Sequence, residues 1–145
     1  MPVYQSDVSI AASPEAVWNV LVDAPGYKEC NPEIVAIEGS LTAGARIKAR
    51  VRVASGAIRP VPMRVTAFQP PSTMQWTGGL PLGLFTGRRT FTVRAAAGGA
   101  HVTMLVEMTG PLASLMLKAT GDRQAEIDRF TSALRARVEA GGTKR

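Results

Sequence analysis

The feature that most constrains this chain is the order of its elements, since strand follows strand from residue 34 to residue 109 before a long helical pattern begins. Apolar and polar residues alternate within these segments, which indicates strands that bury one face. Consecutive strands joined by short turns favour an antiparallel meander. The long helix then has one sheet to pack against, and a sheet that curves around it would enclose an apolar cavity.

Residues 46–53 show the alternation most clearly. One set of alternate positions is apolar (Ile47, Ala49, Val51, Val53), and the other is basic (Arg46, Lys48, Arg50, Arg52). The outer face of a curved antiparallel sheet contacts water, so we interpret the basic row first as a solvated face. The alternative is a surface for an anionic membrane or nucleic acid. Because no aromatic side chains interleave with this row to stack on bases, we expect no nucleic-acid partner.

The other elements follow from the same periodicities. An alternating first strand over residues 4–11 is followed by Ser13-Pro14-Glu15, in which Ser13 can cap a helix with Trp18 on its apolar side. A short second helical turn is expected toward Cys30. The remaining strands are predicted at Ile34–Glu38, Met63–Phe68, Thr73–Thr77, Arg88–Ala95 and Val102–Thr109, the last two as a hairpin that turns near Gly98-Gly99.

The helical pattern after residue 111 has apolar residues three or four apart as far as Val138, which is about seven turns if it is continuous. Gly121-Asp122 lowers the helix propensity near its middle. The fold class is therefore α+β, with a curved antiparallel sheet of about six to seven strands around the C-terminal helix and two short helices after the first strand. We expect a single domain over residues 1–145, of which 141–145 form a disordered basic tail.

Composition agrees with one globular domain. Hydrophobic residues make up 46% and charged residues 19% of the 145 residues, and a chain of this length can fold without disulfides or metals. The single cysteine, Cys30, excludes an internal disulfide and a cysteine-based zinc site. Because the sequence shows neither a signal-peptide pattern nor a membrane-spanning apolar run, we expect a cytoplasmic protein without integral membrane association. A homodimer is a possible assembly of this chain.

Four stretches of the chain together resemble one known family. They are Ile10–Trp18 (IAASPEAVW), Tyr27–Pro32 (YKECNP), Met74–Phe91 (MQWTG followed by GLFTGRRTF) and Phe130–Glu139 (FTSALRARVE). In this order they are similar to the START-like helix-grip superfamily (SRPBCC), and within it to the polyketide cyclase/dehydrase branch of small bacterial proteins. Cys30 stands where that family usually has tryptophan, and Arg89 stands where it often has histidine.

The resemblance implies a helix-grip fold with a cavity between the sheet and the C-terminal helix. It implies binding of a small hydrophobic ligand, such as a lipid, an isoprenoid or a polyketide-like aromatic. The main alternative is an enzyme of the cyclase/aromatase kind, whose cavity would fold a polyketone chain by its shape. A third alternative is a membrane- or nucleic-acid-interacting module that uses the basic row of residues 46–52. No cofactor is expected.

Methionine and aromatic side chains dominate the positions expected to face inward. Alone, such a stripe is typical of a plain core, but together with the resemblance it predicts ligand contacts, because methionines adapt to ligands of irregular shape. The candidate ligand-binding residues are Met63, Met74, Trp76, Phe85, Arg89, Phe91, Met104, Met108, Met116 and Phe130.

Arg89 is the charged member of this set. If it faces inward, its burial is costly unless a partner is present, and an acidic or carbonyl group on a ligand would satisfy it. The alternative is that Arg89 lies near the end of its strand and reaches water. The apolar, glycine-rich residues 78–85 are expected to form a lid or a patch for a partner or membrane. Alternatively, Leu82, Leu84 and Phe85 tuck under the long helix.

The sequence predicts neither a catalytic nor a metal site. The single histidine, His101, is expected to face solvent, because alternation places it opposite the apolar positions of its strand. The carboxylates lie at helix starts, in turns and at outward positions such as Glu107, and no pair converges inside the fold. One histidine and one distant cysteine cannot form a transition-metal site.

Overall fold

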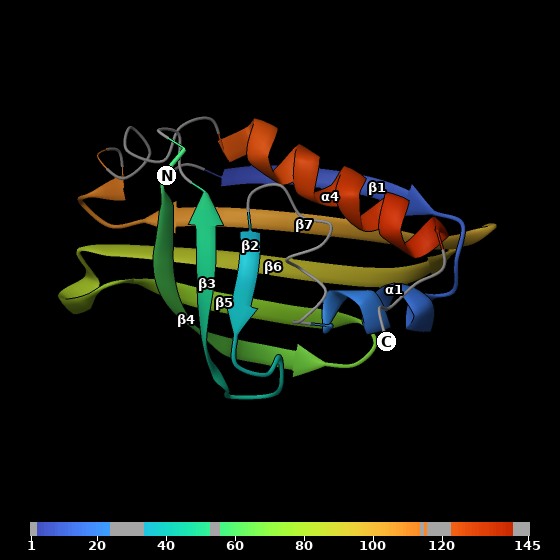
Figure 1. Cartoon of the computed structure of the whole chain (residues 1–145), viewed down its shortest axis with the longest axis horizontal. Helices are drawn as coiled ribbons and strands as arrows, with labels where there is room; N and C mark the ends of the chain where they lie inside the picture. Colours follow the sequence, from blue (N-terminus) through green and yellow to red (C-terminus); the bar gives the residue numbers. More distant parts are fainter. Residues whose placement is uncertain (1–2, 24–33, 53–55, 114, 116–122, 141–145) are drawn as a thin grey trace.

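The computed structural model describes residues 3–23, 34–52, 56–113, 115 and 123–140 (Figure 1). Several predictions lie outside the described residues: the helical turn toward Cys30, Met116, most of the predicted helix before residue 123, and the basic tail 141–145.

Among the described residues, seven strands form one antiparallel sheet. They are β1 (Val3–Ile10), β2 (Ile34–Glu38), β3 (Arg46–Arg52), β4 (Ile58–Gln69), β5 (Thr73–Leu80), β6 (Phe85–Ala96) and β7 (Gly99–Thr109). Their order in the sheet is β1-β7-β6-β5-β4-β3-β2. Strands β2 to β7 are thus consecutive neighbours, and β1 closes the row against β7, which confirms the predicted meander.

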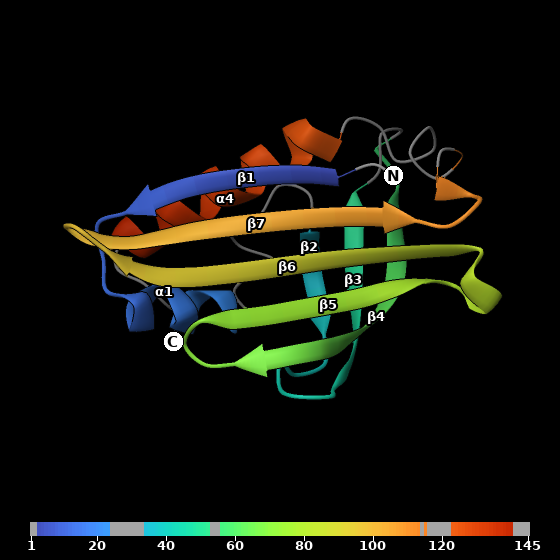
Figure 2. The same ribbon diagram turned by 180° about the vertical axis from the view of Figure 1, so that it is seen from behind.

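Two helices, α1 (Pro14–Leu21) and α4 (Arg123–Glu139), lie on the same side of the sheet. Figure 1 shows β2, β3 and the first part of β4 curling toward this side, and Figure 2 shows the opposite face without helices. We call the side with the helices the concave face and the opposite side the outer face. The described α4 has 17 residues.

Burial follows the alternation of the sequence. In β3, Ile47 and Ala49 are buried, whereas Arg46 and Lys48 are exposed on the outer face. The same rule holds along β7, where every second residue from Ala100 to Met108 is buried. Period-two burial is what a sheet with one dry and one wet face requires.

Strand β4 is longer than predicted, because it begins at Ile58 and not at Met63. The sequence prediction stopped short because Pro60 and Pro62 resemble strand breakers. Over this stretch β4 pairs with β3, and its pairing with β5 starts only at Met63. One side of β4 is therefore an edge at both prolines, and a strand tolerates proline at an edge.

The predicted loop over residues 78–85 is also shorter in the structure. Strand β5 runs on to Leu80, β6 begins at Phe85, and a 3₁₀ turn at Pro81–Gly83 connects them. Gly79, with φ 142°, permits this continuation, because a Cβ there would lie 2.2 Å from the carbonyl oxygen of Phe85. Residues 78–80 therefore belong to the sheet and cannot act as the loop that the sequence suggested.

The helices pack through apolar faces. Ser13 caps α1, since its hydroxyl accepts a hydrogen bond from the Ala16 amide at 3.2 Å. In α4, the residues three, four or seven apart that turn toward the sheet are buried: Ile127, Phe130, Thr131, Leu134 and Val138. This spacing confirms the predicted amphipathic pattern for the described part of the C-terminal helix.

Polar contacts tie α4 to the rest of the fold. The hydroxyl groups of Ser6 on β1 and Thr131 on α4 form a buried hydrogen bond of 2.9 Å. At the other end of the helix, Arg137 forms an ion pair with Asp23, which follows α1, and the side chains are only 10% and 15% exposed. Of the described helices, none combines the length and hydrophobicity needed to cross a bilayer.

The Asp23–Arg137 pair gives a test of how α1 and α4 are joined. We expect Asp23→Asn to destabilise the protein by about 2 kcal/mol, because it leaves a largely buried guanidinium without its counter-charge. The double variant Asp23→Asn/Arg137→Met should recover part of this loss in urea unfolding. Arg135→Met, which breaks an exposed pair with Glu139, serves as control and should cost about 0.5 kcal/mol or less. If the loss of stability in the double variant equals the sum of the losses in Asp23→Asn and Arg137→Met alone, the coupling between the two residues is contradicted.

Candidate functional site

The concave face is built by matched rows of inward side chains from the three central strands. In one row Met74, Phe91 and Met104 lie side by side on β5, β6 and β7. The next row consists of Trp76, Arg89 and Val106, and the one after it of Gly78, Gly87 and Met108. Alternation along each strand, together with the register, therefore fixes which side chains meet.

Three aromatic rings connect the sheet to α4. The ring centroids of Trp76 and Phe91 are 4.9 Å apart at an interplanar angle of 62°, and those of Phe91 and Phe130 are 5.5 Å apart. Such separations and tilts are favourable for aromatic pairs. Each of the three side chains is at most 2% exposed, so this aromatic cluster forms the centre of the core.

Arg89 lies inside the fold and is only 8% exposed. Its guanidinium carbon stands 5.8 Å from the centroid of the Phe130 ring, within the range of a cation–π contact. The alternative that Arg89 reaches water at a strand end is therefore wrong. The physical reason is the true start of β6 at Phe85, which places Arg89 in the interior of the strand, on its inward side.

Beside Arg89, two glycines leave two neighbouring positions of one inward row without side chains. Gly78 and Gly87 oppose each other across β5 and β6. A Cβ at Gly78 would lie 2.6 Å from the Pro62 carbonyl oxygen, so this position admits only glycine. A Cβ at Gly87 would meet its nearest neighbour, the Phe85 ring, at 3.6 Å, which is an ordinary contact. A Cβ at Gly87 would therefore fit without a clash.

The predicted ligand-binding residues divide between two apolar clusters. The larger one contains Met74, Trp76, Phe91, Met104 and Phe130, with Met63 at its margin. The smaller one contains Phe85 and Met108, together with Ala113 and Leu112. Met116 lies outside the described residues. Along β6, Arg89 and Gly87 occupy the inward positions between Phe91 of the first cluster and Phe85 of the second.

The prediction from sequence missed Gly78 and Gly87 as parts of this face. The signal was present, because extending the alternation of Arg89 and Phe91 by one step reaches Gly87 and by two steps reaches Phe85. The predicted strand begins at Arg88, however, so Gly87 falls outside it.

Comparison with known proteins identifies the family. The sequence profile of the family described as "Polyketide cyclase / dehydrase and lipid transport" matches residues 1–139. The chain belongs to this family. The resemblance to the polyketide cyclase/dehydrase branch, drawn from the four sequence motifs, is thereby confirmed. No curated protein matches the sequence significantly.

Solved structures of low sequence identity share the fold of this cyclase/dehydrase family member. A protein from Mesorhizobium loti is 17% identical, with a TM-score of 0.74 over 98% of this chain and 100% of its own. A protein from Thermus thermophilus is 21% identical, with a TM-score of 0.74 over 98% and 100% of the two chains. The di-domain ARO/CYC StfQ from the steffimycin biosynthetic pathway is 10% identical, with a TM-score of 0.71 over 95% of this chain and 51% of StfQ.

Few polar groups are available for chemistry in the interior of this family member. Among the described residues, the buried polar or charged side chains are Ser6, Arg89 and Thr131. Ser6 and Thr131 bond to each other, and Arg89 is the charged member of this set and lies beside Gly87 on β6. In the same part of the chain, no cluster of three or more histidine, cysteine or acidic side chains could hold a metal ion.

His101 lies on the outer face, as its alternation predicts, and joins a network that connects β1 to β7. Its Nε2 atom is 3.1 Å from a carboxylate oxygen of Asp7, and its Nδ1 atom is 3.4 Å from the Ser9 hydroxyl. Thr103 donates a 2.7 Å hydrogen bond to Asp7. This bond first, then those from Gln5 and His101, lower the pKa of Asp7 from 3.8 to about 2.

We expect Thr103→Val to raise the pKa of Asp7 from about 2 toward 3.8, because it removes the strongest of these bonds. Since the folded pKa lies below the unfolded one, the contribution of Asp7 to stability is full above about pH 4 and is lost as the pH falls toward 2. NMR titration of the Asp7 carboxyl measures the shift. Thr92→Val, at the directly opposed position on β6, is the control and should leave this pKa unchanged.

Proposed function

We propose that this protein binds a small hydrophobic molecule, of lipid, isoprenoid or polyketide type, between the concave face and α4. The observation that carries the proposal is the inward row with Gly78 and Gly87, which separates two apolar clusters and adjoins Arg89. Apolar ligands require a dry, apolar lining with a small number of orienting polar groups. The family description, which includes lipid transport, agrees with this assignment.

Arg89 would orient the ligand. Its guanidinium offers a planar set of N–H donors that fits a carboxylate or a carbonyl group, in addition to its contact with the Phe130 ring. Because the side chain is buried at 8% exposure, water competes little for these donors, and a hydrogen bond to the ligand is strengthened. We therefore expect ligands that carry an acidic or carbonyl group at one end of an apolar body.

Native mass spectrometry of the purified protein, followed by extraction, should reveal a bound apolar compound.

Recombinant protein stripped of this compound should bind a pyrene-labelled fatty acid. Gly87→Leu should reduce this binding at least tenfold, because the new side chain would occupy the space beside Arg89 that we propose for the ligand. The thermal unfolding midpoint should change little, because a Cβ at Gly87 meets its neighbours at ordinary contact distances. Thr86→Leu, the adjacent outward position, is the matched control. Unchanged fatty-acid binding in Gly87→Leu would refute this location for the ligand.

The role of Arg89 is tested with a pair of probes. Arg89→Met keeps the length of the side chain but removes the donors, so it should weaken binding of the pyrene fatty acid about tenfold more than binding of its methyl ester. Arg88→Met, one residue away on the outer face, should affect neither probe. Equal losses for acid and ester would contradict a charge-assisted contact between Arg89 and the carboxylate.

A cyclase/aromatase activity is the second candidate, and the fold shared with StfQ favours it. In that case the concave face would bend a polyketone chain, and Arg89 would stabilise an enolate oxygen as it forms. Incubation with a synthetic poly-β-ketone thioester tests this candidate by the absorbance of an aromatic product. An aromatic product that is lost in Arg89→Met would favour the enzyme, and tight binding without turnover would favour the carrier.

A further inference from the structure

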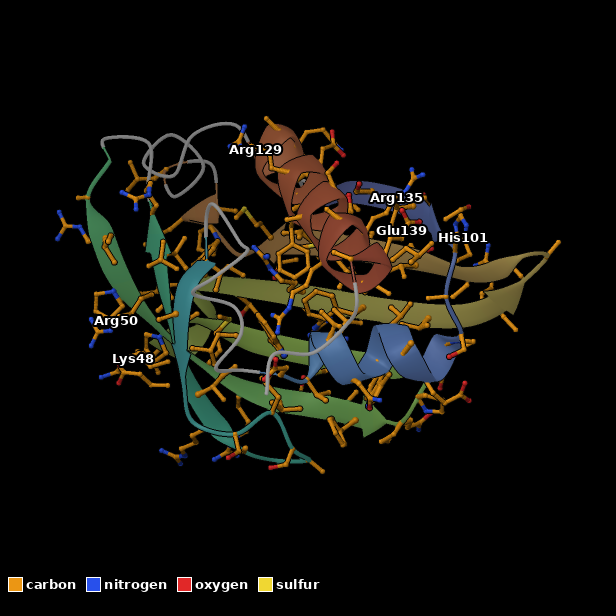
Figure 3. All side chains as sticks on the ribbon, turned by 45° about the vertical axis from the view of Figure 1, so that its right-hand side comes forward. Lys48, Arg50, His101, Arg129, Arg135 and Glu139 are labelled. Carbon is orange, nitrogen blue, oxygen red and sulfur yellow. The ribbon has the colours of Figure 1, made fainter. Side chains whose placement is uncertain are left out.

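The outer face carries a group of exposed cations that the binding site does not use. We define the basic patch as Arg46, Lys48, Arg50 and Arg52 on β3, Arg64 on β4 and Arg88 on β6. Figure 3 shows Lys48 and Arg50 pointing away from the body of the molecule. Because residues two apart on a strand are about 7 Å apart, the β3 row alone extends over about 20 Å.

The register concentrates this charge across strands as well as along them. Arg46 opposes Arg64 on the neighbouring strand, and Thr77 lies between Arg64 and Arg88. On its other side Arg88 is opposed by Glu107 of β7, so the direct juxtaposition of like charges is at Arg46 and Arg64. Like charges directly opposed on adjacent strands are only about 5 Å apart and destabilise a sheet. Within the described part of the chain, neither Arg46 nor Arg64 has an acidic side chain at ion-pairing distance, whereas Arg50 pairs with Glu38.

Short side chains surround these arginines. Thr66 and Thr77 hydrogen bond to each other at 2.8 Å on the same face, and Pro62 opposes Lys48. Long cationic side chains among threonines and prolines stand above their neighbours, so their charged ends can approach an extended surface together. The shape and the charge of the patch thus complement a broad anionic partner.

Exposed leucines stand next to the patch at the end of the β5–β6 hairpin. Leu82 is 95% exposed and Leu84 is 40% exposed, and we call these two residues the leucine tip. Their exposure corrects the expectation that they tuck under the helix. Leu82 also has φ 62°, a left-handed conformation that costs a leucine about 1–2 kcal/mol. A strained, fully exposed apolar side chain indicates a role outside the fold.

The leucine tip and the basic patch belong to one surface. Thr77 opposes Arg88, and three residue pairs further along the same hairpin Leu80 opposes Phe85. Arg88, the residue of the patch on this hairpin, therefore lies about 10 Å before the 3₁₀ turn that carries Leu82. Figures 1 and 2 show β3, the first part of β4 and this turn toward the same end of the molecule, away from α1.

We propose that the basic patch and the leucine tip dock this protein on the surface of an anionic phospholipid bilayer. The guanidinium groups would contact lipid phosphates, which relieves the repulsion between Arg46 and Arg64. The leucines would enter the boundary between headgroups and acyl chains. This docking surface lies on the face opposite the proposed ligand site and is argued without reference to any bound ligand.

Nucleic acid fits the same observations less well. Within the described outer face, no aromatic side chain interleaves with the basic patch to stack on bases. Duplex phosphates could contact the arginines, but phosphate contacts alone would leave the exposed leucines in water. The leucine tip is the feature that distinguishes a lipid surface from a nucleic-acid backbone.

Sedimentation of the full chain with vesicles tests the charge contribution. Vesicles with about one third phosphatidylglycerol should bind the protein, phosphatidylcholine vesicles should not, and added salt should weaken binding. Arg64→Gln should lower binding about fivefold, the change that corresponds to about 1 kcal/mol per basic residue at an anionic leaflet. Arg135→Gln, on α4 and equal in charge change, is the control and should have little effect.

The leucine contribution is tested with Leu82→Asn. Asparagine accepts the left-handed conformation, so the thermal unfolding midpoint should stay the same or rise, while vesicle binding falls several-fold. Val3→Thr, an exposed apolar residue of β1, is the matched control and should bind as wild type does.

Three results would overturn the proposal. The first is equal binding to anionic and neutral vesicles, or binding to neither. The second is an equal loss in Arg64→Gln and Arg135→Gln. The third is tighter binding to duplex DNA than to anionic vesicles, with no effect of Leu82→Asn, which would identify a nucleic-acid surface. None of these outcomes depends on fatty-acid binding, so the ligand proposal would stand or fall separately.

Discussion

The contact between Phe91 on the sheet and Phe130 on α4 is the interaction on which the rest of this structure depends. The meander has a single apolar face, and α4 is the described element that brings an aromatic ring to its centre. Burying one such ring stabilises a fold by about 2–3 kcal/mol. Because Trp76 and Arg89 both adjoin these rings, the same contact sets the position of the candidate site.

The same aromatic cluster helps to accommodate a buried arginine, Arg89. Removing a guanidinium from water is costly, and the π-face of Phe130 offsets part of that cost. On β6 the inward neighbours of Arg89 are Phe91 on one side and Gly87 on the other, so one side of the charge has no side chain next to it on this strand. A polar anchor in an apolar lining is the combination that selects ligands with one polar end.

Alternation predicted most of the fold and failed where backbone geometry overrode it. In Arg46–Arg52 the apolar and the basic residues occupy alternate positions, and this pattern predicted both faces of β3 correctly. Pro60 and Pro62 concealed half of β4, because whether a proline lies at an edge depends on pairing with β5, which a single segment cannot show. Gly79 concealed the hairpin in the same way, since its close approach to Phe85 exists only once the strands are paired.

The candidate site was harder to predict than the fold because its key positions differ by one residue. Arg88 and Arg89 have the same chemistry and adjoin in sequence, yet one is exposed on the outer face and the other is buried among aromatic rings. A shift of one residue in the register of β6 would exchange them and would also turn Gly87 outward. The pairing of Arg89 with Trp76 and Val106 prevents that shift, since each has a buried inward side chain. The register of the central strands therefore places one cation where it can orient a ligand and the other on the external surface. A change in this register would alter both positions at once.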